Sequence, residues 1–297
     1  MAERFSCSVA SAAVDEPLFG TASQIRRWIL VEQPGAWGID AVLQSDLPLE
    51  IATRLRAIAR AERARLLLVR RYGRTAPGPR SCFVVVSTAD VRRVERFTFD
   101  DPGELLEVDW APLRLLEPVG GEAVLDPLYL VCTNGSHDTC CARFGRPVAG
   151  ALDTAFPGEV WEASHFGGDR FAGNLVFLSQ GIYYGRVDPA QAVSLVNGVR
   201  NGELSMDHYR GRSFEPFVAQ AAEHFVRLDR GLFGVDAVVP ETVAELGDRT
   251  FRVVVSTSQR ERVTATVEVD RAAQEQQLTC RSDRLERAPR YRLVSLD

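Results

Sequence analysis

The chain has 297 residues, 45% of them hydrophobic, so it can bury a large core and is long enough for two domains or for one domain with a substantial extension. Its formal net charge of −5 at pH 7 argues against general nucleic-acid binding, which needs a basic surface. Six cysteines are too few for a disulfide scaffold, the N-terminus has no signal-peptide pattern, and no apolar run could span a bilayer. We therefore expect a soluble cytoplasmic protein with no membrane or nucleic-acid partner.

The first third of the chain predicts an α/β unit. Residues 26–35 form an apolar segment closed by Pro-Gly, which is typical of a strand, and residues 47–63 place apolar side chains at helical spacing. Further strands are expected at 64–71, 81–88 and 94–100. We therefore expect an N-terminal α/β domain over residues 1–120 with the element order of a thioredoxin-like unit.

The middle third repeats this order. A strand at 125–135 leads into a polar turn, and Asp138 is a plausible cap for a helix over 138–156, in which Pro147 is the one local conflict. Three strands and a closing helix follow at 159–165, 174–180, 182–187 and 188–202. The order β-α-β-β-β-α is typical of a thioredoxin-like fold, so we expect such a domain over 121–215 and consider a degenerate tandem of two thioredoxin-like units.

The last third indicates a smaller covering structure. Residues 215–231 have the spacing of an amphipathic helix. Residues 249–270 alternate as a β-hairpin does, with a turn near 258–260. We expect residues 216–297 to form a C-terminal helix and β-hairpin that pack as a cover on the main body.

A cysteine-bearing turn follows the strand predicted at 125–135. Cys132 is expected at the carboxyl end of this strand, and Cys140 and Cys141 in the first turn of the next helix, where unpaired N–H groups stabilise thiolates. The next strand can end at the same sheet edge and bring His165 and Asp169 beside the turn. From spacing alone, Cys-x8-Cys with His-x3-Asp indicates a metal site that suits zinc nearly as well as iron.

Two segments resemble the sucrase/ferredoxin-like family, whose core resembles the thioredoxin-like [2Fe-2S] ferredoxins. They are "VCTNGSHDTCCARFGRPVAGAL" and "VWEASHFGGDRFAGNLVFLSQGIYYGRV". The segments "EPLFGTASQIRRWILVEQPGAWG" and "HYRGRSFEPFVAQAAE" also match, so the resemblance covers most of the chain. The family pattern is Cys-x8-Cys followed by His-x3-His. The resemblance implies that Cys132 and Cys141 bind one iron of a [2Fe-2S] cluster, and that His165 binds the other with Asp169 in place of the second histidine.

The resemblance also implies an electron carrier rather than a catalyst. Its partners would be a reductase and an acceptor protein, neither of which the sequence names. The aspartate at 169 is a hard oxygen ligand, which favours ferric iron and a more labile cluster. We expect a potential between that of all-cysteine plant-type clusters, about −400 mV, and the range of histidine-ligated Rieske centres, about −150 to +300 mV.

Two other functions remain open at this point. One is a metal-free thiol-disulfide protein in which Cys132 pairs with Cys141 or Cys140, although no Cys-x-x-Cys is present. The other is a cluster-less or zinc-binding scaffold that has lost the cluster along with the second histidine.

The remaining cysteines and histidines are interpreted as structural. We expect Cys140 to be a core residue or a neighbour of the site, and His137 to be an exposed loop residue rather than a substitute ligand. Asn174 is expected to hold the turn that carries His165. The residues interpreted as isolated packing or structural positions are Cys7, Cys82, Cys280, His208 and His224.

Overall fold

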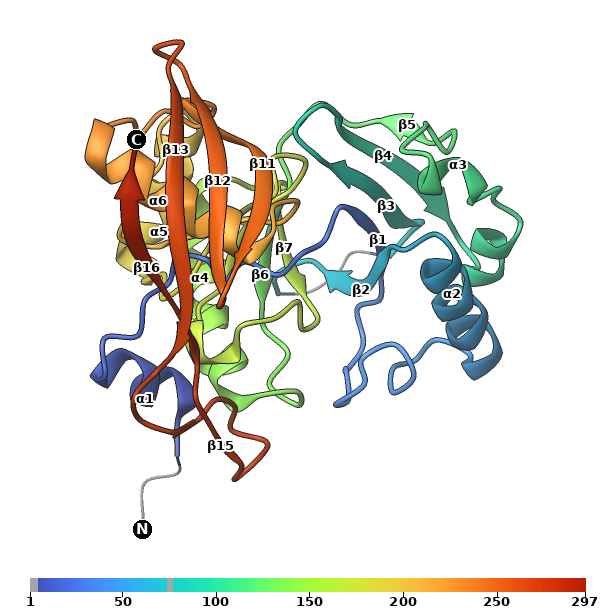
Figure 1. Cartoon of the computed structure of the whole chain (residues 1–297). Helices are drawn as coiled ribbons and strands as arrows, with labels where there is room; N and C mark the ends of the chain where they lie inside the picture. Colours follow the sequence, from blue (N-terminus) through green and yellow to red (C-terminus); the bar gives the residue numbers. More distant parts are fainter. Residues whose placement is uncertain (1–4, 74–76) are drawn as a thin grey trace.

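The computed structural model describes residues 5–73 and 77–297 of the chain. Its centre is one ten-stranded mixed sheet covered by helices, so the α/β class expected from the sequence is confirmed (Figure 1). In spatial order the strands are β10 (Tyr209–Arg212), β9 (Ile182–Tyr184), β8 (Leu175–Phe177), β6 (Tyr129–Cys132), β7 (Val160–Ala163), β2 (Arg65–Arg70), β1 (Arg27–Glu32), β3 (Arg80–Ser87), β4 (Arg92–Phe99) and β5 (Glu122–Ala123).

The sheet consists of two halves with the same strand order. The first half runs β2-β1-β3-β4-β5, and the second runs β7-β6-β8-β9-β10. In each half the first two strands are parallel and are joined by a crossover helix, α2 (Leu49–Ala61) or α4 (Thr139–Ala155), as parallel pairing requires. The halves meet where β2 pairs antiparallel with β7, and an ion pair of 3.0 Å between Arg70 and Glu162 lies at this junction.

The helices and strands predicted in the first two thirds are present close to their expected bounds, including α5 (Pro189–Arg200). Pro147 does not interrupt α4, because it lies on the exposed face, where water can bond the carbonyl that the proline leaves without a donor. The short α1 (Cys7–Ala13) and the edge strands β5 and β10 have no counterpart among the expected elements. Among the helices of residues 5–73 and 77–297, none has the length and apolar character needed to cross a membrane.

The C-terminal part is larger than the expected helix and hairpin. The hairpin is present as β12 (Thr250–Thr257) and β13 (Arg262–Arg271), and it packs against α6 (Phe217–Arg230). Two more strands, β11 (Val238–Gly247) and β16 (Pro289–Leu296), extend it to a four-stranded antiparallel sheet, so the expectation is corrected. Sequence patterns miss these strands because β11 is exposed along most of its length and β16 is nowhere fully buried, so neither shows the pattern of a core strand.

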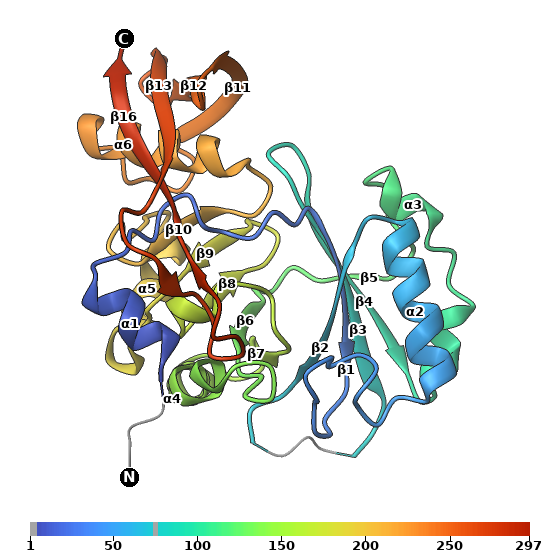
Figure 2. The same ribbon diagram turned by 60° about the horizontal axis from the view of Figure 1, so that its bottom comes forward.

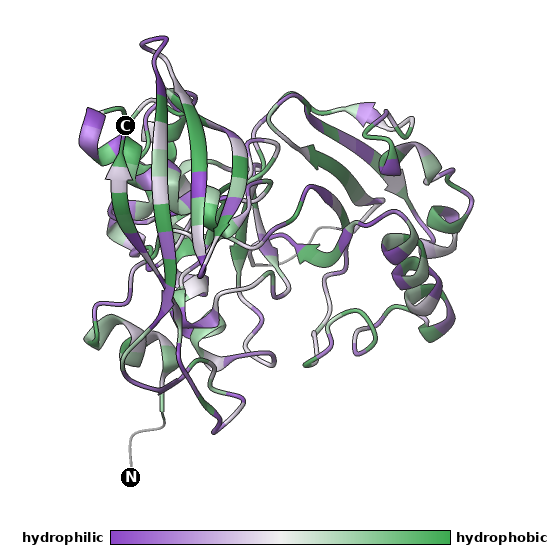
Figure 3. Cartoon of the chain, in the orientation of Figure 1, coloured by the Kyte–Doolittle hydropathy of each residue, from purple (hydrophilic) through white to green (hydrophobic). Residues whose placement is uncertain are grey.

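α6 connects the two sheets. Its buried network reaches β10, where the hydroxyl of Tyr209 donates to the carboxylate of Glu223, which also forms a 2.8 Å ion pair with Arg227. Its apolar face packs against the four-stranded sheet, whose strands alternate hydrophobic and polar residues (Figure 3). The buried strand residues of this layer include Val253, Val255, Val263, Ala265 and Val267.

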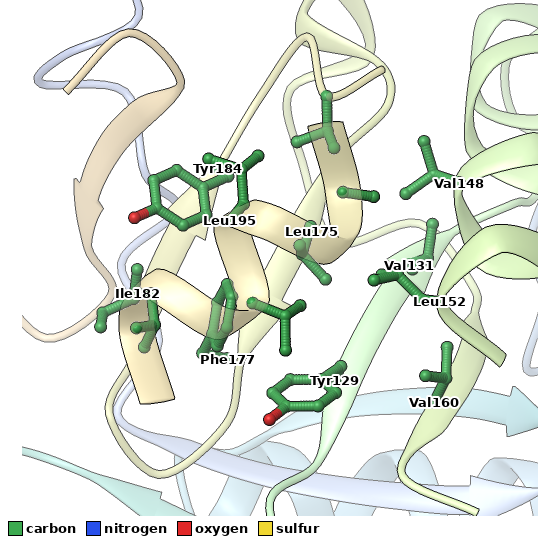
Figure 4. Packing of buried hydrophobic residues seen from close by; sticks show 14 of the residues in the cluster. Tyr129, Val131, Val148, Leu152, Val160, Leu175, Phe177, Ile182, Tyr184 and Leu195 are labelled. Carbon is green, nitrogen blue, oxygen red and sulfur yellow. The ribbon is translucent and has the colours of Figure 1, made fainter. Parts of the chain in front are cut away.

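β6 is buried on both faces of the main sheet. Tyr129 and Val131 point into the layer formed with α4 and α5, where they lie near Leu152 (Figure 4). Because side chains alternate along a strand, Cys132 belongs to the opposite layer, which it shares with Cys141. The central strand thus fixes the direction in which the Cys132 thiol points.

After β13 the chain returns to the main body. Its residues 272–288, with β14 (Gln276–Gln277) and β15 (Leu285–Glu286), run beside α1 and the start of α4 (Figure 1, Figure 2). The C-terminal part therefore covers the end of the main sheet at which Cys132 lies.

α4 crosses the end of β6 at Gly145, and this crossing leaves no room for a side chain. A Cβ atom at Gly145 would lie 2.0 Å from the carbonyl oxygen of Cys132. The close approach also places the first turn of α4 beside the Cys132 thiol. Gly198 in α5 is a matched helical glycine with space around it, since a Cβ atom there would meet Glu203 O at 3.4 Å.

We expect Gly145→Ala to lower the free energy of unfolding by about 1–3 kcal/mol, because the helix must move away from β6. Gly198→Ala should instead raise it by about 0.5–1 kcal/mol, because alanine loses less backbone entropy in a helix. Chemical denaturation of both variants and the wild type measures these changes. Equal effects of the two substitutions would contradict the close crossing.

Candidate metal centre

The four residues predicted for the site come from three segments at one edge of the sheet. Cys132 ends β6 and Cys141 lies in the first turn of α4. His165 lies in the loop after β7, and Asp169 begins the short 3-10 helix η2 (Asp169–Phe171) that follows this loop. Because β6 and β7 are parallel neighbours, their carboxyl ends meet at the same edge. The predicted juxtaposition of the cysteine turn and the histidine loop is present.

The ligand atoms of these residues are close together. Nδ1 of His165 lies 3.9 Å from Sγ of both Cys132 and Cys141, and 2.9 Å from Oδ1 of Asp169. The cysteines are buried, whereas the side chains of His165 and Asp169 keep 16% and 11% of their surface exposed. The site therefore has an inner thiol side and an outer imidazole and carboxylate side, and its donor set is one that metals bind.

Asp138 caps α4 and orients the cysteines. Its Oδ1 accepts a hydrogen bond of 2.9 Å from the backbone N–H of Cys140, which fixes the first turn of the helix. Adjacent residues of a helix point in different directions, so Cys141 faces His165 whereas Cys140 faces Cys7, with the two sulfurs 3.7 Å apart. Cys140 is thus buried, as expected, and its sulfur points away from His165.

The loop that carries His165 is fixed by a buried arginine. Arg210, on β10, donates a hydrogen bond of 2.7 Å to Oδ1 of Asn174, and the Asn174 amide donates one of 2.7 Å to the carbonyl of Gly168. Gly168 has a φ of +89°, and a Cβ atom there would lie 2.5 Å from the guanidinium of Arg210. The expectation that Asn174 holds this turn is confirmed. Arg210 is missed by sequence patterns, because nothing local marks a buried arginine.

His137 belongs to the site, which corrects the expectation of an exposed loop residue. Its ring stacks on that of His165 with centroids 3.8 Å apart and planes 10° apart. Its Nδ1 lies 3.2 Å from the guanidinium of Arg281, in the C-terminal segment. His137 is five residues from Cys132 in the sequence, but only the conformation of the turn brings its ring onto the ring of His165.

The C-terminal segment forms one side of the site. Oγ1 of Thr279 lies 3.1 Å from Oδ2 of Asp169 and 3.1 Å from Oδ2 of Asp138. Arg281 reaches His137 two residues later. These contacts join positions more than 100 residues apart, so sequence spacing could not indicate them.

Without a metal, the two thiols and the imidazole shift one another's pKa values. A hydrogen bond from Cys141 lowers the pKa of Cys132 to about 5; this effect, together with His165, outweighs the opposite effect of burial. The pKa of Cys141 is raised by the same hydrogen bond, by burial and by the negative charge of Cys132. Burial would lower the pKa of His165, but hydrogen bonds to Asp169 and Cys132 raise it to about 9. Both pKa shifts favour the thiolate form of Cys132 and the imidazolium form of His165.

A cavity of about 500 Å³ opens beside His165 and His137. Its opposite wall comes from the first half of the sheet, through the loop at 39–42, α2 and β2. Arg60, Arg65 and Arg281 are among its lining residues and give the accessible side of the site a positive charge.

Comparison with known proteins gives one family and one group of relatives. The family profile described as Sucrase/ferredoxin-like matches residues 18–211. The protein named altered inheritance of mitochondria protein 32, in several strains of Saccharomyces cerevisiae, is 29% identical over a 112-residue alignment, with a coverage of 33% of this chain and 36% of the yeast protein. The chain thus spans about a third of the length of these curated relatives. No solved structure matches it significantly.

The charge state of the metal-free site can be tested by NMR, since the chain has only four histidines. We expect His165 to titrate near pH 9, and Asp169→Asn to lower this pKa because the hydrogen bond that most strongly raises it is lost. The stabilisation from this charge is complete below the unfolded pKa of about 6.5 and is lost as the pH rises through the folded pKa. Asp126→Asn, in an exposed loop, should change nothing. A wild-type His165 pKa near 6.5 would contradict the ion pair.

Proposed function

The chain belongs to the sucrase/ferredoxin-like family, and on this premise we propose that it is an electron-transfer protein whose Cys132, Cys141, His165 and Asp169 hold a [2Fe-2S] cluster. The observation that carries the proposal is the donor set that this family member gathers at one sheet edge, two buried thiols beside a partly exposed imidazole and carboxylate. When bound, such a cluster accepts and releases single electrons.

The donor set fits this cofactor in its chemistry. Two thiols lie on the buried side, so Cys132 and Cys141 would hold one iron, and the partly exposed His165 and Asp169 would hold the other. The first turn of α4 adds backbone N–H groups and a positive helix end, which favour an anionic centre. Asp169 supplies a hard oxygen, which favours ferric iron and a lower potential than a second histidine would give.

His165 would also couple the electron to a proton. Its Nδ1 faces the cysteines and Asp169, whereas its Nε2 forms no protein hydrogen bond within residues 5–73 and 77–297. The cavity beside the ring gives water access to the imidazole. A midpoint potential that stays constant from mildly acidic to alkaline pH would contradict this coupling.

The identical strand order of the two halves supports a tandem of thioredoxin-like units. Each half has two parallel strands followed by antiparallel ones, in the order expected of that fold. On this proposal residues 1–120 and 121–215 are the two units, and residues 216–297 cover them. The second unit carries the site and the first forms the opposite wall of the cavity.

The proposed partners are a reductase and an acceptor protein with acidic surfaces. Arg60, Arg65 and Arg281 at the cavity beside His165 suit such a partner, because opposite charges steer association. All six cysteines are free thiols, which fits the reducing cytoplasm in which we place the protein.

A single zinc ion is the second candidate for the same site, and the short distances favour it. Tetrahedral zinc places a sulfur and a nitrogen ligand roughly 3.5 Å apart, and both sulfurs lie 3.9 Å from His165 Nδ1. A two-iron cluster would hold the cysteine pair and the other pair on different irons, and therefore farther apart. A thiol-disulfide role has less support, because Cys132 and Cys141 are only 1% and 0% exposed.

Metal analysis of anaerobically purified protein decides between these functions. We expect two irons and two acid-labile sulfides per chain, with a rhombic electron paramagnetic resonance signal after reduction. Cys132→Ser should abolish the cluster because it removes a thiolate ligand, whereas Cys140→Ser should retain it because Cys140 faces away. A colourless wild-type protein with zinc at the site would favour the second candidate, and one without metal would contradict both.

Asp169→His tests the role of the fourth side chain. We expect a cluster that persists longer in air and has a higher potential, because a nitrogen replaces a hard oxygen and histidine ligation raises [2Fe-2S] potentials. Potentiometry followed by visible absorption measures the shift. The control is Asp126→His, on an exposed loop. Asp138→His would not serve, because it removes the side chain that caps α4. An unchanged potential would mean that residue 169 is not a ligand.

A further inference from the structure

A second group of metal-binding side chains lies on the other side of the α4 start. It consists of Cys7 at the beginning of α1, Asp138 and Cys140 at the beginning of α4, and Cys280 between β14 and β15. Their ligand atoms all lie within 4.8 Å of one another. The interpretation of Cys7 and Cys280 as isolated residues is therefore wrong. Both contact Cys140, from which Cys7 is 133 residues away in the sequence and Cys280 is 140 residues away.

Three of the six distances between these ligand atoms match the edges of one tetrahedral site, and the other three are within 4.8 Å. Sγ of Cys140 lies 3.7 Å from Sγ of Cys7 and 3.5 Å from Sγ of Cys280, and Sγ of Cys7 lies 3.6 Å from Oδ2 of Asp138. Zinc bound at about 2.3 Å to sulfur and about 2.0–2.2 Å to oxygen separates two sulfurs by about 3.8 Å, and a sulfur from an oxygen by about 3.6 Å. A single ion can therefore contact all four side chains with little movement.

We propose that Cys7, Asp138, Cys140 and Cys280 bind one structural zinc ion. Structural zinc sites are closed by four protein ligands, and this set has three sulfurs and one carboxylate oxygen. Cys7, Asp138 and Cys140 are at most 2% exposed, and Cys280 is partly buried, so water has little access to the ion. The proposal does not depend on what the first site holds.

The surroundings compensate the negative charge of these ligands. The backbone N–H of Cys7 donates to Sγ of Cys280 at 3.3 Å, and the backbone N–H of Cys280 donates to Oδ2 of Asp138 at 2.8 Å. The hydroxyl of Ser6 lies 3.2 Å from Sγ of Cys140. The positive end of α4 lies at the same point. Hydrogen bonds to ligand sulfurs and oxygens orient ligands in established metal sites.

The ion would fasten α1 and the C-terminal segment 272–288 to the start of α4. α1 supplies Cys7 and the C-terminal segment supplies Cys280, while α4 supplies Asp138 and Cys140. Thr279, which contacts Asp169, immediately precedes Cys280, so the ion would also hold the segment that covers the first site.

Zinc and iron contents of the full chain, grown with both metals, test the proposal. Cys7→Ser and Cys280→Ser should each contain one zinc fewer per chain than the wild type, with an unchanged metal content at the first site. Cys82→Ser is the matched control for Cys7→Ser, because Cys82 is as buried as Cys7 but lies within β3 away from the group. Cys132→Ser should lose the metal of the first site and keep this zinc.

A second measurement remains valid if the Cys7→Ser and Cys280→Ser variants do not fold, because it leaves all four proposed zinc ligands in place. Co²⁺ added to reduced, metal-free Cys132→Ser protein should give thiolate-to-cobalt charge-transfer absorption and the visible bands of a tetrahedral site. Absence of these bands would overturn the proposal. Equal zinc in Cys7→Ser, Cys280→Ser and Cys82→Ser would also overturn it, as would non-reducing mass spectrometry that finds a disulfide among Cys7, Cys140 and Cys280.

Discussion

The carboxylate of Asp138 is the contact on which the arrangement of the site depends. One oxygen caps α4 through the backbone N–H of Cys140, a bond typically worth about 0.5–2 kcal/mol. The other accepts from the backbone N–H of Cys280 and from Thr279, so the same group that begins the helix also holds the C-terminal segment. Because the helix begins there, Cys140 and Cys141 point to opposite sides. By fixing where α4 begins, the Asp138 side chain therefore determines that Cys140 points to one group of thiols and Cys141 to the other.

Sequence patterns predict the parts of the site that are close in the chain. Cys132, Cys141 and His165 fall on a strand, the following helix and the loop after the next parallel strand, and the geometry of parallel pairing brings those positions together. The contributions of Cys7, Cys280 and Arg210 could not be predicted in this way. They depend on how the two ends of the chain and β10 pack against the main body, and no local periodicity encodes such contacts.

The two halves of the sheet share a strand order but not a chemistry. Glu32 ends β1 at the place that Cys132 has at the end of β6, and it is used structurally, since it accepts a hydrogen bond of 2.9 Å from the backbone N–H of Ser81. The first half contributes instead the arginines of α2 and β2 that line the cavity next to His165. One half thus carries the proposed ligands, and the other lines the cavity beside them.

The hydroxyl of Thr279 lies at equal distances, 3.1 Å, from a carboxylate oxygen of Asp138 and one of Asp169. A hydroxyl has one proton to donate, so the two carboxylates compete for it, and the more negative one holds it. A cation bound to one of these carboxylates would weaken it as an acceptor, so that the Thr279 hydroxyl would donate its hydrogen bond to the other carboxylate. If both proposed sites bind metal, this shared hydroxyl would link their affinities, and such linkage is reciprocal, so that filling either site would change the affinity of the other by the same factor.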